Sequence, residues 1–284
     1  MTRLALGLMW LLHWLPLPLL AACGRSFGRL LFLFGRERRH VALTNLRLCF
    51  PNMAEAEKSA LARRHFEAFG RSFLERGILW WGSPERIRRA ARVEGLERIP
   101  ADRPVILLVP HFVGLDMGWT RLTLERDMVS IYANQKNLLF NAALYRGRLR
   151  FGRSELLSRQ EGTRRAIRAM KAGRPFYYLP DMDYGERDTI FVPFFGVPAA
   201  TITGLSRLAR MTGAAVVPVV TRMNEAGYVV EISAPWQDFP GAGIEADTRR
   251  MNAFIEAEIL KMPEQYLWLH KRFKTRPPGE KRPY

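Results

Sequence analysis

A histidine and an aspartate in the first half of the chain could carry out acid–base chemistry. His111 closely follows the apolar run Val105–Val109, and Asp116 comes five positions later, with Gly114 between them. A carboxylate that binds one imidazole nitrogen fixes the tautomer and leaves the other nitrogen able to accept a proton. The pattern therefore predicts His111 as a general base and Asp116 as its orienting partner. The alternative is a chance histidine and aspartate in one loop.

The two side chains can meet only if the chain turns between them. On one straight helix, five residues rotate the chain by about 140°, so the side chains would diverge. A strand that leads through Gly114 into a helix supplies the turn. The sequence has no cysteine placed as a nucleophile, so we expect the histidine to activate a hydroxyl group of the substrate.

Three arginines in one short run are further candidates. Arg146, Arg148 and Arg150 lie in a predicted basic helix and loop over residues 138–151. One guanidinium group could stabilise a developing oxyanion or hold a phosphate group. The run could equally be a solvated basic face, and the residues alone do not decide between the two.

Two carboxylates follow a second buried run. Asp181 and Asp183 come directly after Pro175–Pro180, which is predicted to be a strand. Such a pair could bind a metal ion, or it could position an arginine or backbone groups through hydrogen bonds. No third ligand is close in the sequence, so a metal site is not expected.

The elements that must hold these side chains alternate between apolar strands and amphipathic helices. This alternation favours an α/β fold with a central, mostly parallel sheet flanked by helices, in which loops at one sheet edge build the site. Strands are predicted over residues 105–109, 128–133, 175–180, 215–220 and 228–233, and helices over residues 55–81, 115–126, 163–172, 203–212 and 245–260.

The overall charge indicates an anionic partner. The 284 residues include 44 Lys and Arg against 27 Asp and Glu, which gives a net charge of +17. Phospholipid headgroups, nucleic acid or an acidic protein would suit this surplus. No nucleic-acid-binding fold signature accompanies it, so nucleic acid is not expected. Cys23 and Cys49 form no metal-binding or disulfide pattern, which favours a reducing compartment.

The N-terminus is rich in apolar residues and predicts a membrane-anchoring helix. Leu4–Ala22 has 19 residues and no formal charge, just enough to cross a bilayer core as a helix. Pro16 and Pro18 weaken the helical prediction in its second half. The apolar run Leu30–Phe34 would allow the region to lie in the membrane interface instead.

Residues 1–34 are therefore predicted to anchor one domain over residues 35–284. Arginines crowd the segment after the apolar run, whereas only Arg3 precedes it. By the positive-inside tendency, the domain after the anchor stays in the cytoplasm. In an alternative interpretation, Leu20–Cys23 is a lipoprotein cleavage site and the chain is a secreted lipoprotein.

Three segments, in this order, resemble the late acyltransferases of lipid A biosynthesis in Gram-negative bacteria. The first is the pair His111 and Asp116, whose spacing is shared with the wider glycerolipid acyltransferases. The second joins Asp181–Gly185 with Phe191–Gly196, and the third is Gln265–Pro277. The second and third are much narrower signatures than the first, and the resemblance extends from the apolar N-terminus to the end of the chain.

The resemblance implies an enzyme of the bacterial inner membrane with a glycerolipid-acyltransferase-like fold and its catalytic domain on the cytoplasmic side. Such an enzyme moves a fatty acyl chain from acyl carrier protein to a hydroxyl group on an acyl chain of a lipid A precursor of Kdo-lipid IVA type. Its partners would be acyl carrier protein, this phosphorylated precursor and inner-membrane lipids. The family's reaction needs no cofactor or metal ion.

The resemblance also assigns roles to single residues. His111 would be the general base and Asp116 its partner, although several members of the family carry glutamate at the second position. An arginine of the family that contacts the substrate or the oxyanion maps best to Arg148.

Five further residues are expected to bind the substrate. The two remaining arginines of the basic run leave the assignment of the oxyanion contact open. The segment Glu161–Arg164 resembles a conserved block of the glycerolipid enzymes and offers another arginine, and the two aspartates lie in the second family segment. The five residues are Arg146, Arg150, Arg164, Asp181 and Asp183.

Two alternatives keep part of this interpretation. The same chemistry could act on a glycerolipid acceptor, because the histidine–aspartate spacing is shared with those enzymes. A membrane-tethered protein that binds anionic lipid would explain the charge and leave the pair incidental. For a catalytic chain, we expect an apolar tunnel, lined by side chains such as Phe112 and Trp119, to measure the acyl chain.

Overall fold

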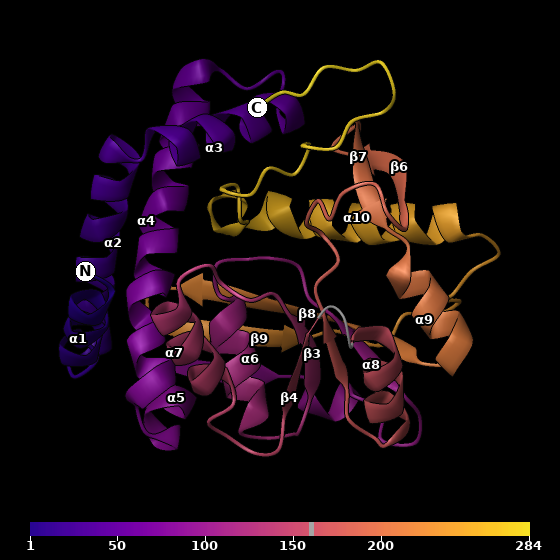
Figure 1. The fold of residues 1–284 in the computed structure, drawn as a ribbon, viewed down its shortest axis with the longest axis horizontal. Coiled ribbons are helices and arrows are strands. Elements are labelled where there is room, and N and C mark those ends of the chain that lie inside the picture. Colours follow the sequence, from indigo (N-terminus) through magenta and orange to yellow (C-terminus); the bar gives the residue numbers. More distant parts are fainter. Residues whose placement is uncertain (159–161) are drawn as a thin grey trace.

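The computed structural model describes residues 1–158 and 162–284, and its main feature is a seven-stranded sheet in the order β1-β9-β8-β2-β5-β3-β4 (Figure 1). Neighbouring strands are parallel except for β8 and β9. The predicted α/β class with a mostly parallel sheet is therefore confirmed. The strands are β1 (Ala91–Glu94), β2 (Val105–Leu108), β3 (Val129–Tyr132), β4 (Glu155–Ser158), β5 (Phe176–Tyr178), β8 (Ala215–Asn224) and β9 (Gly227–Ile232).

Helices cover both faces of the sheet, because side chains alternate between the two faces along each strand. Val105 and Leu107 of β2 share a core cluster with α6 (Leu115–Thr123). Ile106 and Leu108 belong to the cluster on the other face. The helices that contribute to this second cluster from the second half of the chain are α8 (Gly162–Lys171), α9 (Gly204–Thr212) and α10 (Ile244–Lys261).

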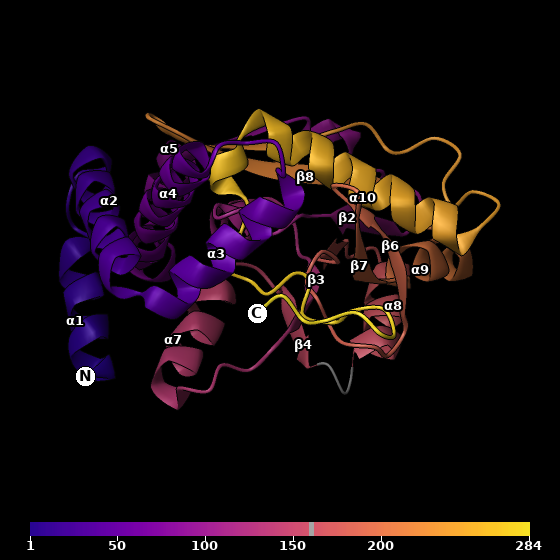
Figure 2. The same ribbon diagram turned by 90° about the horizontal axis from the view of Figure 1, so that it is seen from above.

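A second group of helices stands at one end of the sheet, around the long helix α4 (Figures 1 and 2). The predicted single apolar helix over Leu4–Ala22 is broken near Pro16, because proline lacks a backbone N–H and clashes with the preceding turn. Among the described residues, α2 is the one helix long and apolar enough to cross a membrane. The group comprises α1 (Thr2–Leu12), α2 (Leu17–Phe34), α3 (Arg36–Cys49), α4 (Glu55–Trp81), α5 (Pro84–Ala90) and α7 (Leu138–Arg148).

Helices α2 and α4 pack backbone against backbone. A Cβ atom added to Gly28 would lie 2.1 Å from the carbonyl oxygen of Phe66, and one added to Gly70 would lie 2.5 Å from the backbone nitrogen of Gly28. Only glycine permits so close an approach. Beside this contact, Arg29 and Glu67 form an ion pair at 2.8 Å. The N-terminal helices are therefore packed onto the rest of the molecule along the length of α2.

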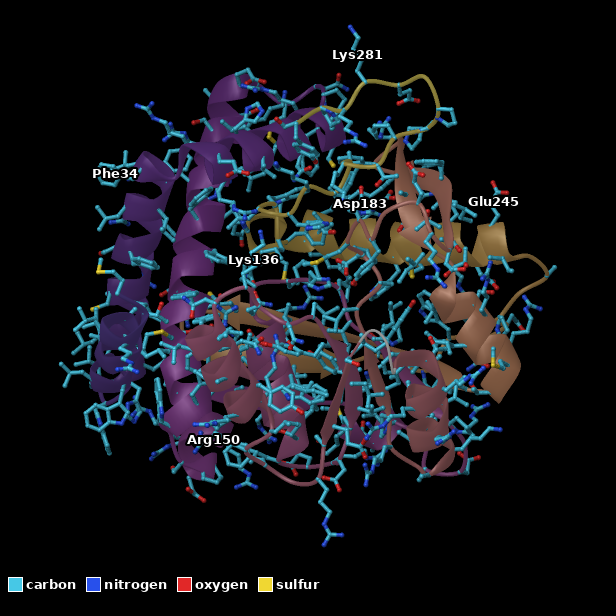
Figure 3. All side chains as sticks on the ribbon, in the orientation of Figure 1. Phe34, Lys136, Arg150, Asp183, Glu245 and Lys281 are labelled. Atoms are coloured by element: carbon cyan, nitrogen blue, oxygen red, sulfur yellow. The ribbon has the colours of Figure 1, made fainter. Side chains whose placement is uncertain are left out.

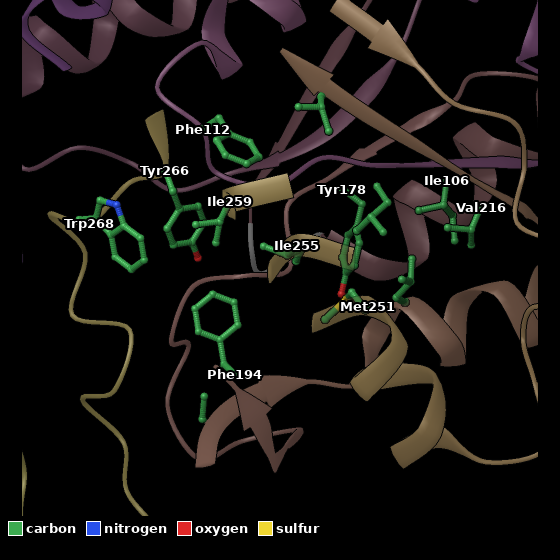
Figure 4. Close-up of a cluster of buried hydrophobic side chains, with 14 of the residues drawn as sticks. Ile106, Phe112, Tyr178, Phe194, Val216, Met251, Ile255, Ile259, Tyr266 and Trp268 are labelled. Atoms are coloured by element: carbon green, nitrogen blue, oxygen red, sulfur yellow. The ribbon is translucent and has the colours of Figure 1, made fainter. Parts of the chain in front are cut away.

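The end of the chain packs behind the segment that carries His111. Residues 111–113 and 265–267 are joined by two backbone hydrogen bonds of 2.8 and 2.9 Å. Phe112 and Tyr266 form an isolated β-bridge there, and their ring centroids lie 5.8 Å apart (Figure 4). The histidine is therefore supported from two sides, by the sheet and by the C-terminal segment.

One two-stranded hairpin was not predicted from the sequence. β6 (Thr189–Phe194) and β7 (Val197–Ile202) pair antiparallel outside the main sheet and contact α10. The family-like segment Phe191–Gly196 forms most of β6 and the turn, with Phe194 fully buried beside Tyr266 (Figure 4).

Candidate active site

His111 meets Asp181 at the carboxyl edge of the sheet. β2 and β5 are parallel neighbours in which Leu108 pairs with Tyr178. His111 comes three residues after Leu108, and Asp181 comes three residues after Tyr178. The register of the two strands therefore brings His111 and Asp181 side by side. The backbone N–H of His111 donates to Oδ2 of Asp181 at 2.9 Å, and the ring Nδ1 lies 2.6 Å from Oδ1.

The Asp181 carboxylate determines which ring nitrogen of His111 carries the proton. Burial by itself raises the pKa of Asp181, but attraction to His111 and the hydrogen bonds from it bring the pKa below its usual value. An ionised carboxylate only accepts hydrogen bonds, so Nδ1 carries the proton and Nε2 holds the lone pair. The side chain of His111 is 13% exposed, whereas that of Asp181 is fully buried. Nε2 is therefore suited to accept a proton from a bound hydroxyl group.

Asp116 has different partners from the one expected. It lies in the first turn of α6, where Nε of Arg76 is 2.8 Å from Oδ2 and Nε of Arg148 is 2.8 Å from Oδ1. Within residues 1–158 and 162–284, no hydrogen bond joins His111 to Asp116. The first turn of α6 packs towards α4 and α7, whereas β5 lies directly beside β2. The expected pairing of His111 with Asp116 is therefore corrected to a pairing with Asp181.

Two guanidinium groups share the single carboxylate of Asp116. Burial alone would raise the pKa of this carboxyl group, but the charges and hydrogen bonds of Arg148 and Arg76 hold it far below its usual value. The side chains of Arg76 and Arg148 are 19% and 21% exposed. Two cations and one anion leave a positive surplus that attracts developing negative charge nearby.

Arg76 is the functional candidate that the sequence interpretation missed. It belongs to the amphipathic helix α4, outside every motif, where an arginine is ordinarily part of a solvated face. No signal in the sequence connects it to Asp116, 40 residues away. Packing of α4 against α6 creates the contact.

The structure separates the three arginines of the basic run. Arg148, at the end of α7, is the one that reaches Asp116. Arg150 donates to the carbonyl oxygens of Leu79 at 2.6 Å and Gly82 at 2.9 Å, so it caps the end of α4. Arg146 is exposed on α7.

Arg164 lies several strands away from His111 along the sheet. It is exposed near the start of α8, which follows β4, and β4 is three strands away from β2. At the usual strand spacing this corresponds to about 14 Å. Glu161, the first residue of the segment that suggested Arg164, lies outside the described residues.

Asp183 ties the C-terminal segment to the sheet edge. Its Oδ2 accepts the backbone N–H of Thr275 at 2.6 Å, and its Oδ1 accepts the Thr275 hydroxyl at 2.8 Å. The backbone N–H of Asp183 donates to Nε2 of His270 at 2.9 Å. Burial lowers the pKa of His270 to about 4, so its ring is neutral at pH 7 and accepts this bond. Within the described ranges, no three His, Cys, Asp or Glu side chains are grouped to hold a metal ion.

Phe112 and Trp119 are core residues, which corrects their expected place in an acyl tunnel. Both are at most 2% exposed, and Trp119 packs edge-to-face on Tyr177 with ring centroids 5.3 Å apart. The indole N–H of Trp119 donates to the carbonyl oxygen of Arg148 at 2.8 Å. Trp119 thus fixes the backbone from which the Arg148 side chain extends to Asp116.

Comparison with known proteins shows the family of the chain. Residues 1–275 match the family described as bacterial lipid A biosynthesis acyltransferase. The chain is 37% identical to the lipid A biosynthesis lauroyltransferase of Escherichia coli K12, over 98% of this chain and 93% of the relative. It is 34% identical to the palmitoleoyltransferase of the same organism, over 99% and 93%.

A solved structure is also similar. The 1-acyl-sn-glycerophosphate acyltransferase of Thermotoga maritima has a TM-score of 0.41 and 16% identity, over 86% of this chain and 97% of that one. The family match covers nearly the whole chain, and the relatives are matched over nearly their whole length. The chain therefore belongs to the bacterial lipid A biosynthesis acyltransferases.

Proposed function

We propose that the chain transfers a fatty acyl group from the thioester of acyl carrier protein to a hydroxyl group on an acyl chain of a lipid A precursor of Kdo-lipid IVA type. As a member of its family, the chain is an acyltransferase of lipid A biosynthesis. The pair of His111 and Asp181 at the sheet edge is the observation that supports this mechanism. It provides a base of defined tautomer within reach of a bound hydroxyl group.

In the proposed reaction, Nε2 of His111 takes the hydroxyl proton while the acceptor oxygen attacks the thioester carbonyl carbon. The new C–O bond gives a tetrahedral intermediate with a negatively charged oxygen. When this intermediate collapses, the C–S bond breaks and the departing thiolate takes the proton from His111. Asp181 stabilises the imidazolium that exists between the two proton transfers, as a buried carboxylate does in other histidine bases.

Arg148 is the proposed donor to the oxyanion. Preorganised cationic donors lower the barrier because they meet the charge that develops in the transition state. Asp116 and Arg76 act as positioning residues: Asp116 holds the Arg148 guanidinium in place, and Arg76 supplies the second positive charge of the cluster. Both of these roles differ from the direct contact with His111 that the sequence suggested for Asp116.

The remaining assignments concern partners and location. We propose that the catalytic domain, residues 35–284, lies on the cytoplasmic side of the bacterial inner membrane and that residues 1–34 anchor it among the membrane lipids. The net charge of +17 favours association with an acidic carrier protein and with a phosphorylated precursor. Arg146 and Arg164, both exposed, are candidates for contacts with phosphate groups.

A transfer assay tests this function directly. Membranes that contain the chain are offered acyl carrier protein thioesters of different lengths and a tetra-acylated lipid A precursor. We expect a product heavier by one acyl chain. His111→Ala should lower the rate by about 10³-fold or more, and Asp181→Asn by about 10²- to 10⁴-fold, because each removes part of the base.

His40→Ala is the matched control, since His40 is exposed on α3 and should leave the rate unchanged. If His111→Ala and Asp181→Asn both kept the wild-type rate, the proposal that His111 is the general base would be wrong. A product with a lysophospholipid acceptor and none with the lipid A precursor would assign the chemistry to a glycerolipid instead.

A further inference from the structure

Most of the exposed apolar surface of the chain lies on three helices. Of the 17 large apolar side chains that are exposed in the described residues, ten lie within residues 1–34 and three on α7. On α1, Leu4, Leu8 and Leu11 follow one helix face and are between 54% and 75% exposed. Water-soluble monomers rarely present such a continuous apolar surface.

Helix α2 extends this surface. Leu30, Leu33 and Phe34 recur at helical spacing and are between 52% and 79% exposed. Figure 3 shows Phe34 on the outer side of α2, away from α4. The opposite side of α2 carries Gly24 and Gly28, whose backbones touch α4. One side of α2 is thus packed on protein, whereas the other is largely exposed among residues 1–158 and 162–284.

The first turn of α7 continues the same surface. Leu138 is 80% exposed and Leu139 is 47% exposed. The side-chain amide of Asn137 donates to the hydroxyl of Thr2 at 2.7 Å, so the start of α7 lies beside the start of α1. Figure 2 shows both helix starts on the same side of the molecule, opposite α10. Segments more than a hundred residues apart therefore contribute to one apolar face.

The packing of α2 against α4 disfavours a bilayer crossing by this helix. The 18 residues of α2 span about 27 Å and would fill the hydrocarbon core. α4 lies alongside and would be drawn in with its charged side chains Arg63, Arg64 and Glu67. Each such charge would be strongly unfavourable at the bilayer centre, where it loses its hydration. The packing of α2 in this fold favours an orientation along the membrane surface.

We propose that α1, the outer face of α2 and the first turn of α7 insert together into the interface of an anionic bilayer, and that none of these helices crosses it. Exposed Arg3, Arg29 and Lys136 flank the apolar side chains and attract anionic headgroups (Figure 3 shows Lys136). The inference deepens the proposed function and rests on it in one respect, namely that this bilayer holds the acceptor lipid.

This orientation places the candidate active site at the bilayer. β3, which leads through residues 133–137 into α7, is parallel to β5 and β2, so its carboxyl end lies at the same sheet edge as His111 and Asp181. At the other end of α7, Arg148 donates a hydrogen bond to Asp116. Insertion of the first turn of α7 therefore directs the sheet edge with the base towards the lipid, and the acceptor acyl chain reaches Nε2 of His111 from the apolar phase.

Depth-dependent fluorescence quenching tests the insertion of α7. In a Cys23→Ser background, in which only the buried Cys49 remains, Leu139→Cys is labelled with an environment-sensitive dye. The full chain is bound to vesicles of phosphatidylethanolamine and phosphatidylglycerol that contain nitroxide lipids. We expect strong quenching by shallow nitroxides at position 139 and none at Leu260→Cys, a control on α10 that is 62% exposed in the native protein. Equal, weak quenching at both positions would overturn the proposal.

A second measurement tests whether α2 crosses the bilayer. Arg3→Cys and Arg36→Cys, again in the Cys23→Ser background, lie in the first turn of α1 and just after the end of α2. When the chain is added to sealed vesicles, a membrane-impermeant thiol reagent should modify both positions without lysis. Protection of one of them until the vesicles are lysed would show a crossing helix and contradict the in-plane arrangement.

The functional consequence is measured with the double variant Leu138→Glu/Leu139→Glu. We expect the ratio of activity on vesicle-embedded acceptor to activity on detergent-dispersed acceptor to fall about tenfold. Leu260→Glu should keep the wild-type ratio. An unchanged ratio in the double variant would contradict a role of α7 in approaching the lipid. If the unmodified chain transferred no acyl group at all, the proposed function would fail, whereas the quenching and labelling results would still decide the membrane arrangement.

Discussion

The two carboxylates near His111 take different parts in the site. Asp181 binds the ring nitrogen and sets its tautomer, whereas Asp116 holds two arginines. Their surroundings explain the division, because Asp181 has a histidine beside it and Asp116 has two permanent cations. The net charge around the reacting atoms therefore depends on Arg76. Among the described residues, no hydrogen bond joins Arg76 to His111.

Loss of Arg76 should reduce catalysis through charge. In Arg76→Gln, Asp116 and Arg148 would neutralise each other, and the positive surplus that meets the oxyanion would disappear. We expect kcat to fall about 10- to 100-fold with little change in KM, measured in the same transfer assay. Arg76→Lys restores the charge and should recover part of the rate.

Arg63→Gln is the matched control for Arg76, because Arg63 is on the same helix and forms an exposed ion pair with Glu67 at 3.5 Å. A rate in Arg76→Gln equal to that of Arg63→Gln would show that the second guanidinium group has no part in the reaction.

At the scale of the elements, the close packing of α2 on α4 requires glycine, which has no side chain, at the points of contact. The close approach at Gly28 leaves no room for a Cβ atom, since the nearest atoms belong to the backbone of α4 and cannot turn away. The pair supports the site as well, because α4 carries Arg76.

A single methyl group at this contact should separate the two helices. We expect Gly28→Ala to lower the free energy of unfolding by about 1–3 kcal/mol, the usual cost of overpacking a tight contact. Thermal unfolding of the detergent-solubilised chain, followed by circular dichroism, measures the change. Gly7→Ala is the control: a Cβ atom there meets nothing within 4 Å, and the helix propensity of alanine should keep or raise the stability. Equal stability of the two variants would contradict the tight packing.

The elements themselves were largely predictable from the sequence. Hydrophobic periodicity predicted α4 over residues 55–81, and the apolar runs predicted β2, β3, β5, β8 and β9, within a few residues except at the end of β8. β1, β4 and the β6–β7 hairpin were missed. Pro193 and Pro198 interrupt the strand pattern in the hairpin, and pairing outside the main sheet leaves part of it exposed.

For the site, the sequence indicated most of the residues but not how they pair with one another. Asp181, His111, Asp116 and Arg148 were all singled out, but their pairing depends on which strands are neighbours and where each helix turns. A spacing of five residues suggested one pair, whereas the strand order β2-β5 created another. The contact between Arg76 and Asp116 depends on helix packing, which no local pattern encodes.

At the scale of the whole molecule, two buried histidines should make stability depend on pH. Burial lowers the pKa of both His65 and His270 to about 4. The unfolded chain binds protons at these groups as the pH falls below about 6.5, but the folded chain does not until about pH 4. Stability should therefore be full above pH 6.5 and fall as the pH decreases towards 4, by up to about 3 kcal/mol per histidine.

Melting temperatures measured between pH 7.5 and pH 4.5 test this dependence. The double variant His65→Gln/His270→Gln should show a clearly weaker dependence on pH, while His40→Gln, at an exposed position, should behave as the wild type. A wild-type melting temperature that stays constant over this range would exclude these two histidines as the cause of acid sensitivity.

The contact between residues 111–113 and 265–267 has a consequence for biosynthesis. A ribosome releases the chain in order from its N-terminal side, so the apolar helices of residues 1–34 leave the ribosome well before the residues that support His111. The segment that carries the base cannot acquire its backbone hydrogen bonds to Gln265 and Leu267 until these two residues have left the ribosome. The support of the base is thus acquired only after residues 265–267 are made, and a nascent chain interrupted before residue 265 would already carry its apolar helices but lack this support.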